Sequence, residues 1–259
     1  LGCNVSPEGE DWIVSVPVTR SLDLKREIDL IEEIARLIGY DQFASSIPEP
    51  IKPGGLDPSR TIERRIRNYF CTTGFQELTT SSLVSSSNHE KSIGVSNPLL
   101  SETSHLRMDL WKEHLEVFKR NVSHGSDAVW MYEIGKTYEK LENKYVEKPI
   151  LSGLIAGTKA FGRWKSSDKV KNLDYYQARG LLKQALQGLN IEISDTKHND
   201  ESHYHPGKSA DLILEGKTFG TFGEIHPLIA NNHSIQTSLY LFELKMDSII
   251  RSATRKNIW

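Results

Sequence analysis

The sequence predicts an α+β fold in which an antiparallel β-sheet is flanked by helices, preceded by the remnant of a small helical domain. Hydrophobic residues are 37% and charged residues 25% of the 259, which is typical of a globular chain. Between residues 58 and 259, strand-like segments follow one another as hairpins with a few helices between them. A segment at 44–57, rich in Pro and Gly, separates this part from residues 1–43 and is the expected linker.

Charge and composition exclude several classes of protein. The chain has 32 basic and 34 acidic residues, so its formal net charge of −2 gives no overall basic footprint for nucleic acid. No apolar run approaches the ~20 residues of a membrane helix, and we expect no membrane partner. Two cysteines and no signal-peptide pattern favour a cytoplasmic location. The missing initiator Met predicts a piece of a longer protein.

Residues 1–43 contain one strand-like run and one amphipathic helix. The run lies at 12–18, where apolar and polar residues alternate. In the helix that follows, Gly39 is the predicted end, and an apolar arc opposes an acidic one. The apolar arc consists of Ile28, Ile31, Ile34, Ala35 and Ile38.

Beyond the linker, local signals place each element in turn. Asp57 is the expected N-cap of a helix over 58–73, with Pro58 at its first position and Gly74 after its end. Its apolar face holds Ile62, Ile66, Tyr69 and Phe70. Further helices are expected at 110–125 and at 174–189, the second capped by Asp174. Strands are expected at 75–84, 128–139, 150–157, 209–216, 217–225 and 238–246.

The sharpest chemical pattern is a set of acidic residues near the first helix. Asp29, Glu32 and Glu33 share one helix face, and Asp23 lies just before the helix. Oxygen ligands without His or Cys suit Mg²⁺ better than zinc. The same residues also fit a solvated acidic face, with Asp23 as N-cap and Arg36 as ion-pair partner. On spacing alone both interpretations remain open.

Other polar clusters favour structural roles. His198, His203 and His205 have no Cys or carboxylate at a zinc-like spacing, which favours a loop or core role. The glycines at 216–223 are not followed by the Lys-Ser or Lys-Thr of a phosphate loop. No G-x-S-x-G elbow surrounds any serine of residues 79–90.

The helix over 58–73 carries a cluster of arginines, which are Arg60, Arg64, Arg65 and Arg67. They fit an RNA patch, an edge that meets a partner helix, or a solvated face. The residues alone do not choose among these three.

Several segments together resemble the β subunit of bacterial phenylalanyl-tRNA synthetase. They are VPVTRSLDLKREIDLIEEIARLIGYD at 16–41, SNPLLSETSHLRMDL at 96–110, MYEIGKTY at 131–138, HPGKSADLIL at 205–214 and FGEIHP at 222–227. They occur in the family's order, and the resemblance covers essentially the whole chain.

The resemblance implies an architecture and a function. Residues 1–43 would end a small central domain, and residues 58–259 would form a catalytic-like class II synthetase module. The family's enzyme joins L-phenylalanine to tRNA(Phe) with ATP, as an (αβ)₂ heterotetramer whose active site lies in the α subunit. Its editing region lies upstream of this chain and its anticodon-binding domain downstream. We therefore expect an α-binding structural module with no catalytic or cofactor-binding residues of its own, and ATP only at the α-subunit site.

The class II signatures are altered in the residues that matter for catalysis. Met131 stands where the second signature has an Arg two residues before Glu133, and Ile225 stands where the third has an Arg after a Glu. The first signature survives as helix 58–73, with Ser81 or a neighbour at its Pro position. The missing arginines argue against an autonomous ATP-dependent class II-like ligase, because fixed cations stabilise a transferring phosphate. Near-neutral charge argues against a free-standing RNA- or Mg-binding module.

The family also carries a magnesium site shared with the α subunit. Asp23, Asp29, Glu32 and Glu33 match its ligands position by position. The resemblance therefore implies that these four carboxylates bind Mg²⁺.

Overall fold

A computed structural model describes residues 1–49, 54–86, 89–142, 144–158, 172–199 and 203–254. The chain forms two compact units, Leu1–Gly55 and Leu56–Trp259. The last residues of the chain, 255–259, lie outside the described residues.

The first unit contains a β-hairpin as well as a helix. Strands β1 (Asn4–Glu8) and β2 (Asp11–Ser15) pair in antiparallel fashion, and α1 spans Glu27–Ile38 between the short 3-10 helices η1 (Val18–Arg20) and η2 (Tyr40–Gln42). Gly39 ends α1 with a φ of 95°, as predicted. The expected strand at 12–18 is shorter, and β1 was not anticipated. A purely helical remnant is therefore not confirmed for this unit.

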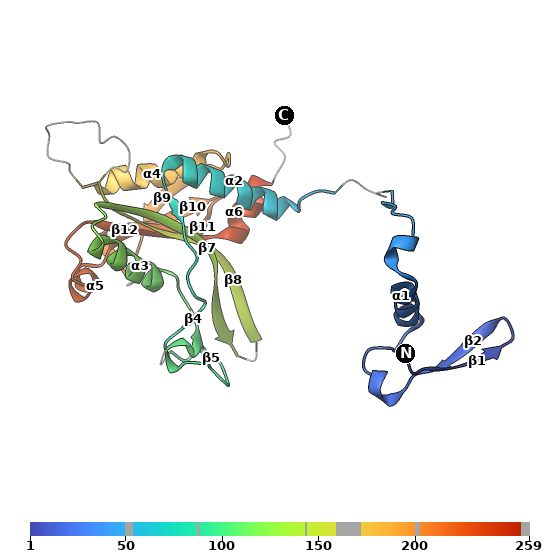
Figure 1. Ribbon diagram of the computed structural model, residues 1–259. Helices are drawn as coiled ribbons and strands as arrows, with labels where there is room; N and C mark the ends of the chain where they lie inside the picture. The colour runs from blue at the N-terminus through green and yellow to red at the C-terminus, as the bar shows by residue number, and fades with distance from the viewer. Residues whose placement is uncertain (50–53, 87–88, 143, 159–171, 200–202, 255–259) are drawn as a thin grey trace. The chain divides into compact units, whose positions relative to one another are not determined.

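The second unit is built on one twisted seven-stranded sheet (Figure 1). Its strand order is β3 (Gln76–Glu77), β7 (Ala128–Leu141), β8 (Lys144–Gly157), β12 (Leu239–Lys245), β11 (Lys217–Ile225), β10 (Tyr204–Leu214) and β9 (Ile193–Lys197). The hairpin expected near Gly216 joins β10 to β11.

The expectation of an antiparallel sheet needs one correction, because β3 runs parallel to β7. The other pairings of the described sheet are antiparallel, so the sheet is mixed. A parallel pair requires a long crossover, and here the chain between β3 and β7 includes a small sheet and a helix. That small sheet consists of β4 (Leu83–Val84), β5 (Ile93–Gly94) and β6 (His105–Leu106), with the 3-10 helix η3 at Ser101–Thr103.

Helices cover both faces of the large sheet (Figure 1). One face carries α2 (Pro58–Thr73), α4 (Tyr175–Gln187) and α6 (Met246–Ala253). The opposite face, called the α3 face below, carries α3 (Trp111–Ser123) and α5 (Pro227–Asn232). Because side chains alternate along a strand, neighbouring residues of β7 enter different cores: Trp130 packs on the α2 side and Met131 on the α3 side.

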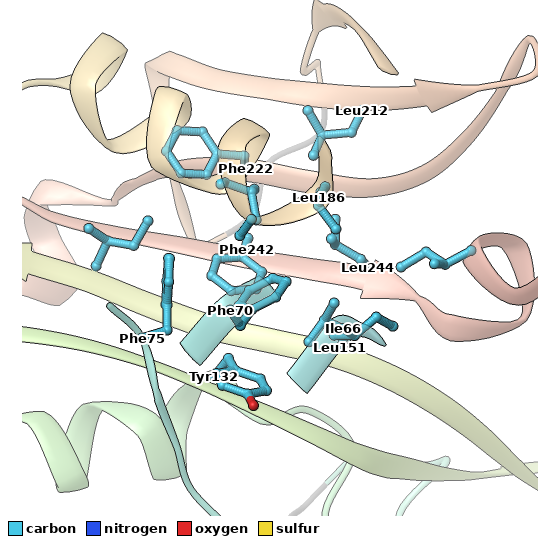
Figure 2. Packing of buried hydrophobic residues seen from close by; sticks show 14 of the residues in the cluster. Ile66, Phe70, Phe75, Tyr132, Leu151, Leu186, Leu212, Phe222, Phe242 and Leu244 are labelled. Carbon is cyan, nitrogen blue, oxygen red and sulfur yellow. The ribbon is translucent and has the colours of Figure 1, made fainter. Parts of the chain in front are cut away.

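The larger core lies under α2 (Figure 2). Of the predicted apolar face, the stripe of Ile62, Ile66 and Phe70 is buried there, whereas Tyr69 is 38% exposed. The Phe70 ring lies 4.8 Å from the ring of Tyr132. Burying a side chain of this size contributes about 1.5–3 kcal/mol, so this stripe fixes α2 on the sheet.

Local capping sets the ends of the two long helices on this face. Asp57 accepts a hydrogen bond from the backbone N–H of Ser59 at 2.8 Å, and Gly74 ends α2 with a φ of 104°. Asp174 caps α4 by accepting from the backbone N–H of Gln177 at 2.8 Å. All three predicted positions are confirmed.

Candidate functional site

Met131 and Ile225, which stand where the class II signatures have phosphate-binding arginines, lie in one apolar cluster on the α3 face. Met131 on β7 and Ile225 on β11 are each 3% exposed. Both pack in the cluster formed by Leu115 and Phe118 of α3 with apolar side chains of the sheet. Helix α3 therefore closes this part of the sheet with hydrocarbon, where the class II signatures would require cations.

Strand β11, which ends at Ile225, leads into α5, and strand β12 leads into α6 in the same way. The second junction also lacks an arginine after its glutamate. Strand β12 ends in Glu243-Leu244-Lys245, and α6 begins at Met246. Whichever of these two strand–helix junctions is compared with the third signature, no arginine follows the glutamate.

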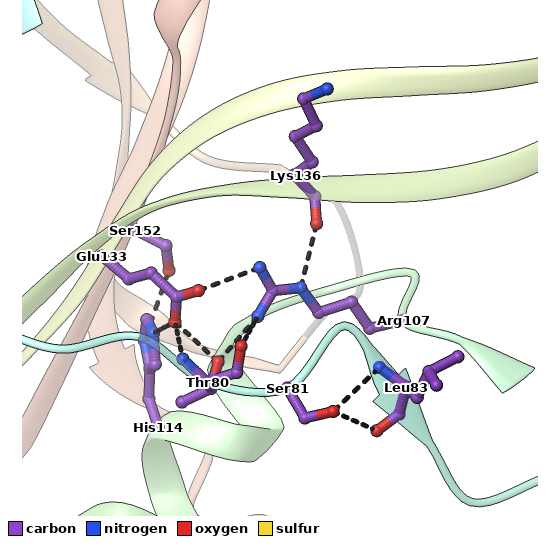
Figure 3. Close-up of polar contacts among 8 residues, drawn as sticks. All are labelled: Thr80, Ser81, Leu83, Arg107, His114, Glu133, Lys136 and Ser152. Carbon is purple, nitrogen blue, oxygen red and sulfur yellow. Dashed lines mark hydrogen bonds and ion pairs between the residues drawn. The ribbon is translucent and has the colours of Figure 1, made fainter. Parts of the chain in front are cut away.

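The second-signature glutamate, Glu133, is held in a buried polar network beside this cluster (Figure 3). Arg107 Nη2 donates to Glu133 Oε1 at 2.9 Å, and Arg107 Nη1 donates to Thr80 Oγ1 at 2.6 Å. The Thr80 hydroxyl in turn donates to Glu133 Oε2 at 2.6 Å. His114 Nε2 lies 3.3 Å from the same oxygen, and Ser152 lies beside the His114 ring.

The electrostatics of the network favour an ionised glutamate. Burial acts to raise the pKa of the Glu133 carboxyl, but hydrogen bonds from His114 and Thr80, with the charge of Arg107, outweigh it and lower that pKa. Arg107 also donates from Nε to the backbone carbonyl of Lys136 at 2.9 Å. The network thus ties together the chain after β3, the start of α3 and the strand β7.

Sequence reasoning missed the roles of Arg107 and His114. Both are buried, at 3% and 0% exposure, whereas such residues are seldom fully buried without partners. The only signal was that Arg107 lies within the 96–110 segment that carries the resemblance. Ser81, the residue at the expected Pro position, hydrogen-bonds through its hydroxyl to the backbone N–H and C=O of Leu83 (Figure 3).

Three of the four predicted magnesium ligands, Asp23, Asp29 and Glu33, are bound to arginines or backbone rather than to one another. Arg20 Nη2 lies 2.7 Å from Asp23 and 2.6 Å from Glu33, and Arg36 also pairs with Glu33. Hydrogen bonds from Arg20 lower the pKa of both carboxyls. Glu32 is exposed.

Asp29 has a local role in starting α1. It accepts from the backbone N–H of Arg26 at 2.8 Å and pairs with the Arg26 side chain at 3.0 Å. The N-cap position belongs to Arg26, so the alternative role of Asp23 as N-cap is wrong. Among the described residues no three His, Cys, Asp or Glu side chains gather in a way that could hold a metal ion. In this arrangement the carboxylates do not fit a bound cation, and the magnesium site stays a prediction.

Each of the three histidines has a different main partner, and the rings of His198 and His203 both lie near Tyr204, at 5.7 and 4.2 Å. His198 Nδ1 is 2.8 Å from Asp211, the His203 ring stacks on Trp111 at 4.7 Å, and His205 Nδ1 accepts from the backbone N–H of Gly207 at 2.9 Å. Each has a structural contact of its own, in line with the loop and core roles expected from the sequence.

Helix α2 uses part of its polar surface inside the unit. Arg65 donates to the backbone carbonyl of Gly188 at 2.5 Å, and Tyr69 lies so close to Gly188 that a Cβ there would be 1.9 Å from its ring. Arg67 pairs with Glu77 at 2.8 Å. Exposed side chains of the same helix include Arg60, Arg64, Asn68 and Cys71, of which Arg60 pairs with Glu63 at 2.8 Å.

No helix in the described part of the chain is both long and apolar enough to cross a membrane.

Comparison with solved structures defines the class of fold. The chain is similar to pyrrolysyl-tRNA synthetase from Desulfitobacterium hafniense, with a TM-score of 0.54 and 11% sequence identity, over 76% of this chain and 73% of that one. A second structure of the same synthetase matches with the same TM-score over 72% of its length. At this identity the similarity shows the fold alone: the class II aminoacyl-tRNA synthetase core.

Sequence comparison identifies the family. Residues 44–246 match the family described as phenylalanyl tRNA synthetase beta chain CLM domain, and residues 1–40 match the tRNA synthetase B5 domain. The chain therefore belongs to the phenylalanyl-tRNA synthetase β-chain family.

Curated relatives agree with this assignment. The chain is 48% identical over 258 residues to the phenylalanine–tRNA ligase beta subunit of a strain of Prochlorococcus marinus, covering 99% of this chain and 31% of that protein. The beta subunit of Parasynechococcus marenigrum is 46% identical over 259 residues, covering 32% of its length. The chain thus spans about a third of the length of these relatives.

Proposed function

We propose that this chain is the non-catalytic, α-binding part of a phenylalanine–tRNA ligase β subunit. The assembled enzyme would join L-phenylalanine to tRNA(Phe) at the expense of ATP, as a cytoplasmic (αβ)₂ heterotetramer with its active site in the α subunit. The family assignment supports the subunit.

One observation carries the non-catalytic part of the proposal: Met131 and Ile225, where the resemblance places the two signature arginines, are buried in a single apolar cluster. The other candidate junction has Leu244 after its glutamate. A phosphoryl-transfer site depends on preorganised cations at the transferring phosphate. Hydrocarbon at both positions offers none. Arg107, a cation nearby, is already paired with Glu133 at 2.9 Å. These points favour a scaffold over an autonomous class II-like ligase.

The domain limits of the proposal are a small central domain over 1–43, a linker over 44–57 and the catalytic-like module over 58–259. The two compact units and the two family matches, at 1–40 and 44–246, support these limits. The presence of both parts in one chain favours a β subunit over a free-standing RNA- or Mg-binding module.

For the α-subunit contact, we propose the outer stripe of α2. Arg60, Arg64 and Asn68 recur every four residues and are exposed, so they form one continuous ridge. Arginine is favoured at interfaces because it combines contact area with several hydrogen-bond donors. Arg65 and Tyr69 are excluded from this ridge because they dock α2 on the end of α4.

Pyrophosphate exchange tests the non-catalytic assignment. The chain, incubated with L-phenylalanine, ATP and Mg²⁺, is expected to give no phenylalanine-dependent ATP–pyrophosphate exchange, whereas a preparation with the α subunit and the full β subunit exchanges. A companion variant, Met131→Arg, places an arginine at the second-signature position of this chain. Because that side chain would enter a closed apolar cluster, we expect no exchange activity from it either. Exchange by the α-free chain would overturn the proposal.

A further inference from the structure

A row of polar side chains crosses the α3 face of the sheet. The strand register places Glu133 beside Ser152, Ser152 beside Glu243, Glu243 beside Thr221, and Thr221 beside Asp211. In-register neighbours on one face have Cβ atoms about 4.5–5.5 Å apart. The five residues therefore form one line across β7, β8, β12, β11 and β10.

The acidic groups at the two ends of this row have partners. Glu133 is bound by Arg107 and His114, as described above. Asp211 lies 2.8 Å from His198 Nδ1 and accepts from the Thr221 hydroxyl at 3.0 Å. Glu243, in the middle, forms no ion pair with any residue in the described part of the chain; it receives a backbone hydrogen bond from Leu110, at the start of α3.

A small pocket opens at the unpaired carboxylate. Its volume is about 260 Å³, and Glu243 lines it together with the hydroxyl-bearing residues Thr137, Thr218 and Thr221. Met108 and Ile150 supply apolar wall, and Lys245 lines the same space. The volume lies below the ~300–1,000 Å³ typical of sites for drug-sized ligands, which points to a smaller molecule.

Among the described residues no cation is paired with the Glu243 carboxylate, and its burial makes the charged form unfavourable. Burial, reinforced by the nearby Asp109, raises the pKa of the Glu243 carboxyl to about 7, against the opposing effects of the Leu110 backbone and Lys112. Lys245 faces the same side of β12 two residues further on, about 7 Å along the strand. An ammonium group beside Glu243 would supply the counter-charge, and a carboxylate on the same small molecule would reach Lys245.

We propose that this pocket binds a small zwitterionic amino acid, with its ammonium group on Glu243, its carboxylate on Lys245 and an aliphatic side chain against Met108 and Ile150. The threonine hydroxyls supply further acceptors for the ammonium protons and donors for the carboxylate. Glu243 belongs to the β12–α6 junction described above, and the proposal concerns binding of a ligand there, not catalysis.

The alternative is that Glu243 serves only to complete the N-terminus of α3, where a carboxylate is favourable without any ligand. The two roles differ in what a charge-neutral replacement does. A glutamine at 243 still accepts from the Leu110 backbone, but it offers an ammonium group no charge.

Ligand-observed saturation-transfer NMR on the 259-residue chain tests the proposal, with L-alanine, alaninamide and propionate as probes. We expect L-alanine to bind with a Kd of the order of 1 mM, more tightly than alaninamide, which lacks the carboxylate, and than propionate, which lacks the ammonium. Glu243→Gln should weaken L-alanine binding about tenfold or more. Lys245→Met should reduce it to the level of alaninamide.

The matched control is Glu116→Gln, which neutralises an exposed carboxylate of α3 and should leave L-alanine binding unchanged. Each variant is first compared with the parent chain by its thermal unfolding midpoint. Because Lys245 is exposed, its replacement tests the site without disturbing the hydrophobic core. Saturation transfer to L-alanine that survives Glu243→Gln, or its absence at tens of millimolar, would overturn the proposal.

Discussion

The Arg107 guanidinium lies 2.9 Å from the Glu133 carboxylate, and both side chains are only 3% exposed. This ion pair joins residues 26 positions apart, and it lies beside the apolar cluster that holds Met131 and Ile225. The charge of the signature glutamate is compensated by the chain itself.

Removing one member of this ion pair should lower the free energy of unfolding more than neutralising both members does. Arg107→Met leaves a buried carboxylate unpaired, a change that costs about 3–5 kcal/mol in the free energy of unfolding. Adding Glu133→Gln to Arg107→Met should recover a large part of that loss, because the amide can still bond to Thr80. Urea denaturation at pH 7 of the two single variants and the double variant measures the coupling. A double variant no more stable than Arg107→Met would mean that the pair contributes little beyond packing.

A second prediction concerns acid sensitivity at His203. Burial, with the nearby charges of Lys112 and His198, lowers the pKa of this imidazole to about 4. The unfolded chain, with the ordinary value near 6.5, therefore binds more protons in this range, and His203 should reduce stability as the pH falls from about 6.5 to 4.

His203→Phe keeps a ring to stack on Trp111 but cannot be protonated. We expect it to narrow the drop in the thermal unfolding midpoint between pH 7 and pH 5, by a few degrees. His233→Gln, which replaces a half-buried imidazole after α5, is the control. If both variants lose stability with acid as steeply as the parent chain, His203 is not the titrating group.

The magnesium prediction can be tested through the arginine that now neutralises its ligands. Arg20 lies within 2.7 Å of both Asp23 and Glu33, so a cation must displace it. We expect Mg²⁺ to bind this chain weakly and Arg20→Ala to strengthen binding several-fold, as measured by isothermal titration calorimetry. Arg120→Ala is the matched control, because Arg120 is an exposed arginine of α3 and pairs with none of the four carboxylates. Should Arg20→Ala bind Mg²⁺ no better than the parent chain, the carboxylates would be an acidic face with internal ion pairs.

The sequence predicts correctly those features that depend on interactions between residues close together in the chain, such as helix caps, tight turns and ion pairs within one helix. The Asp57, Pro58 and Gly74 signals gave the limits of α2 because capping is decided within one helical turn. The hairpin at Gly216 was equally clear, since that residue adopts a φ of 76° in the turn. Arg36 was expected to pair with Glu32 and Glu33 on α1, and it pairs with Glu33.

What could not be predicted depends on partners distant in the chain. The parallel pairing of β3 follows from the crossover that places it beside β7, and a two-residue strand carries almost no periodic signal. The polar row of Glu133, Ser152 and Glu243 exists only once three strands are in register. The arrangement of the acidic residues of α1 likewise depends on Arg20, which lies 13 residues from Glu33.

The last prediction concerns the outer ridge of α2. Arg60→Glu with Arg64→Glu reverses two exposed charges on this ridge, and neither residue is in the buried stripe, so the fold should persist. If the ridge contacts the α subunit, assembly with α should weaken by about tenfold or more, because like charges placed across an interface are strongly unfavourable. Sedimentation of the α subunit with each β variant measures this.

Arg120→Glu, at an exposed position of α3 on the opposite face of the sheet, is the matched control and should assemble normally. Arg65→Ala provides a further contrast, since it removes the hydrogen bond to Gly188 and should lower the unfolding midpoint more than it lowers assembly. Assembly that withstands the double charge reversal, in a variant with normal circular dichroism, would place the α-subunit contact on another surface. Loss of assembly with Arg120→Glu instead would place it on the α3 face.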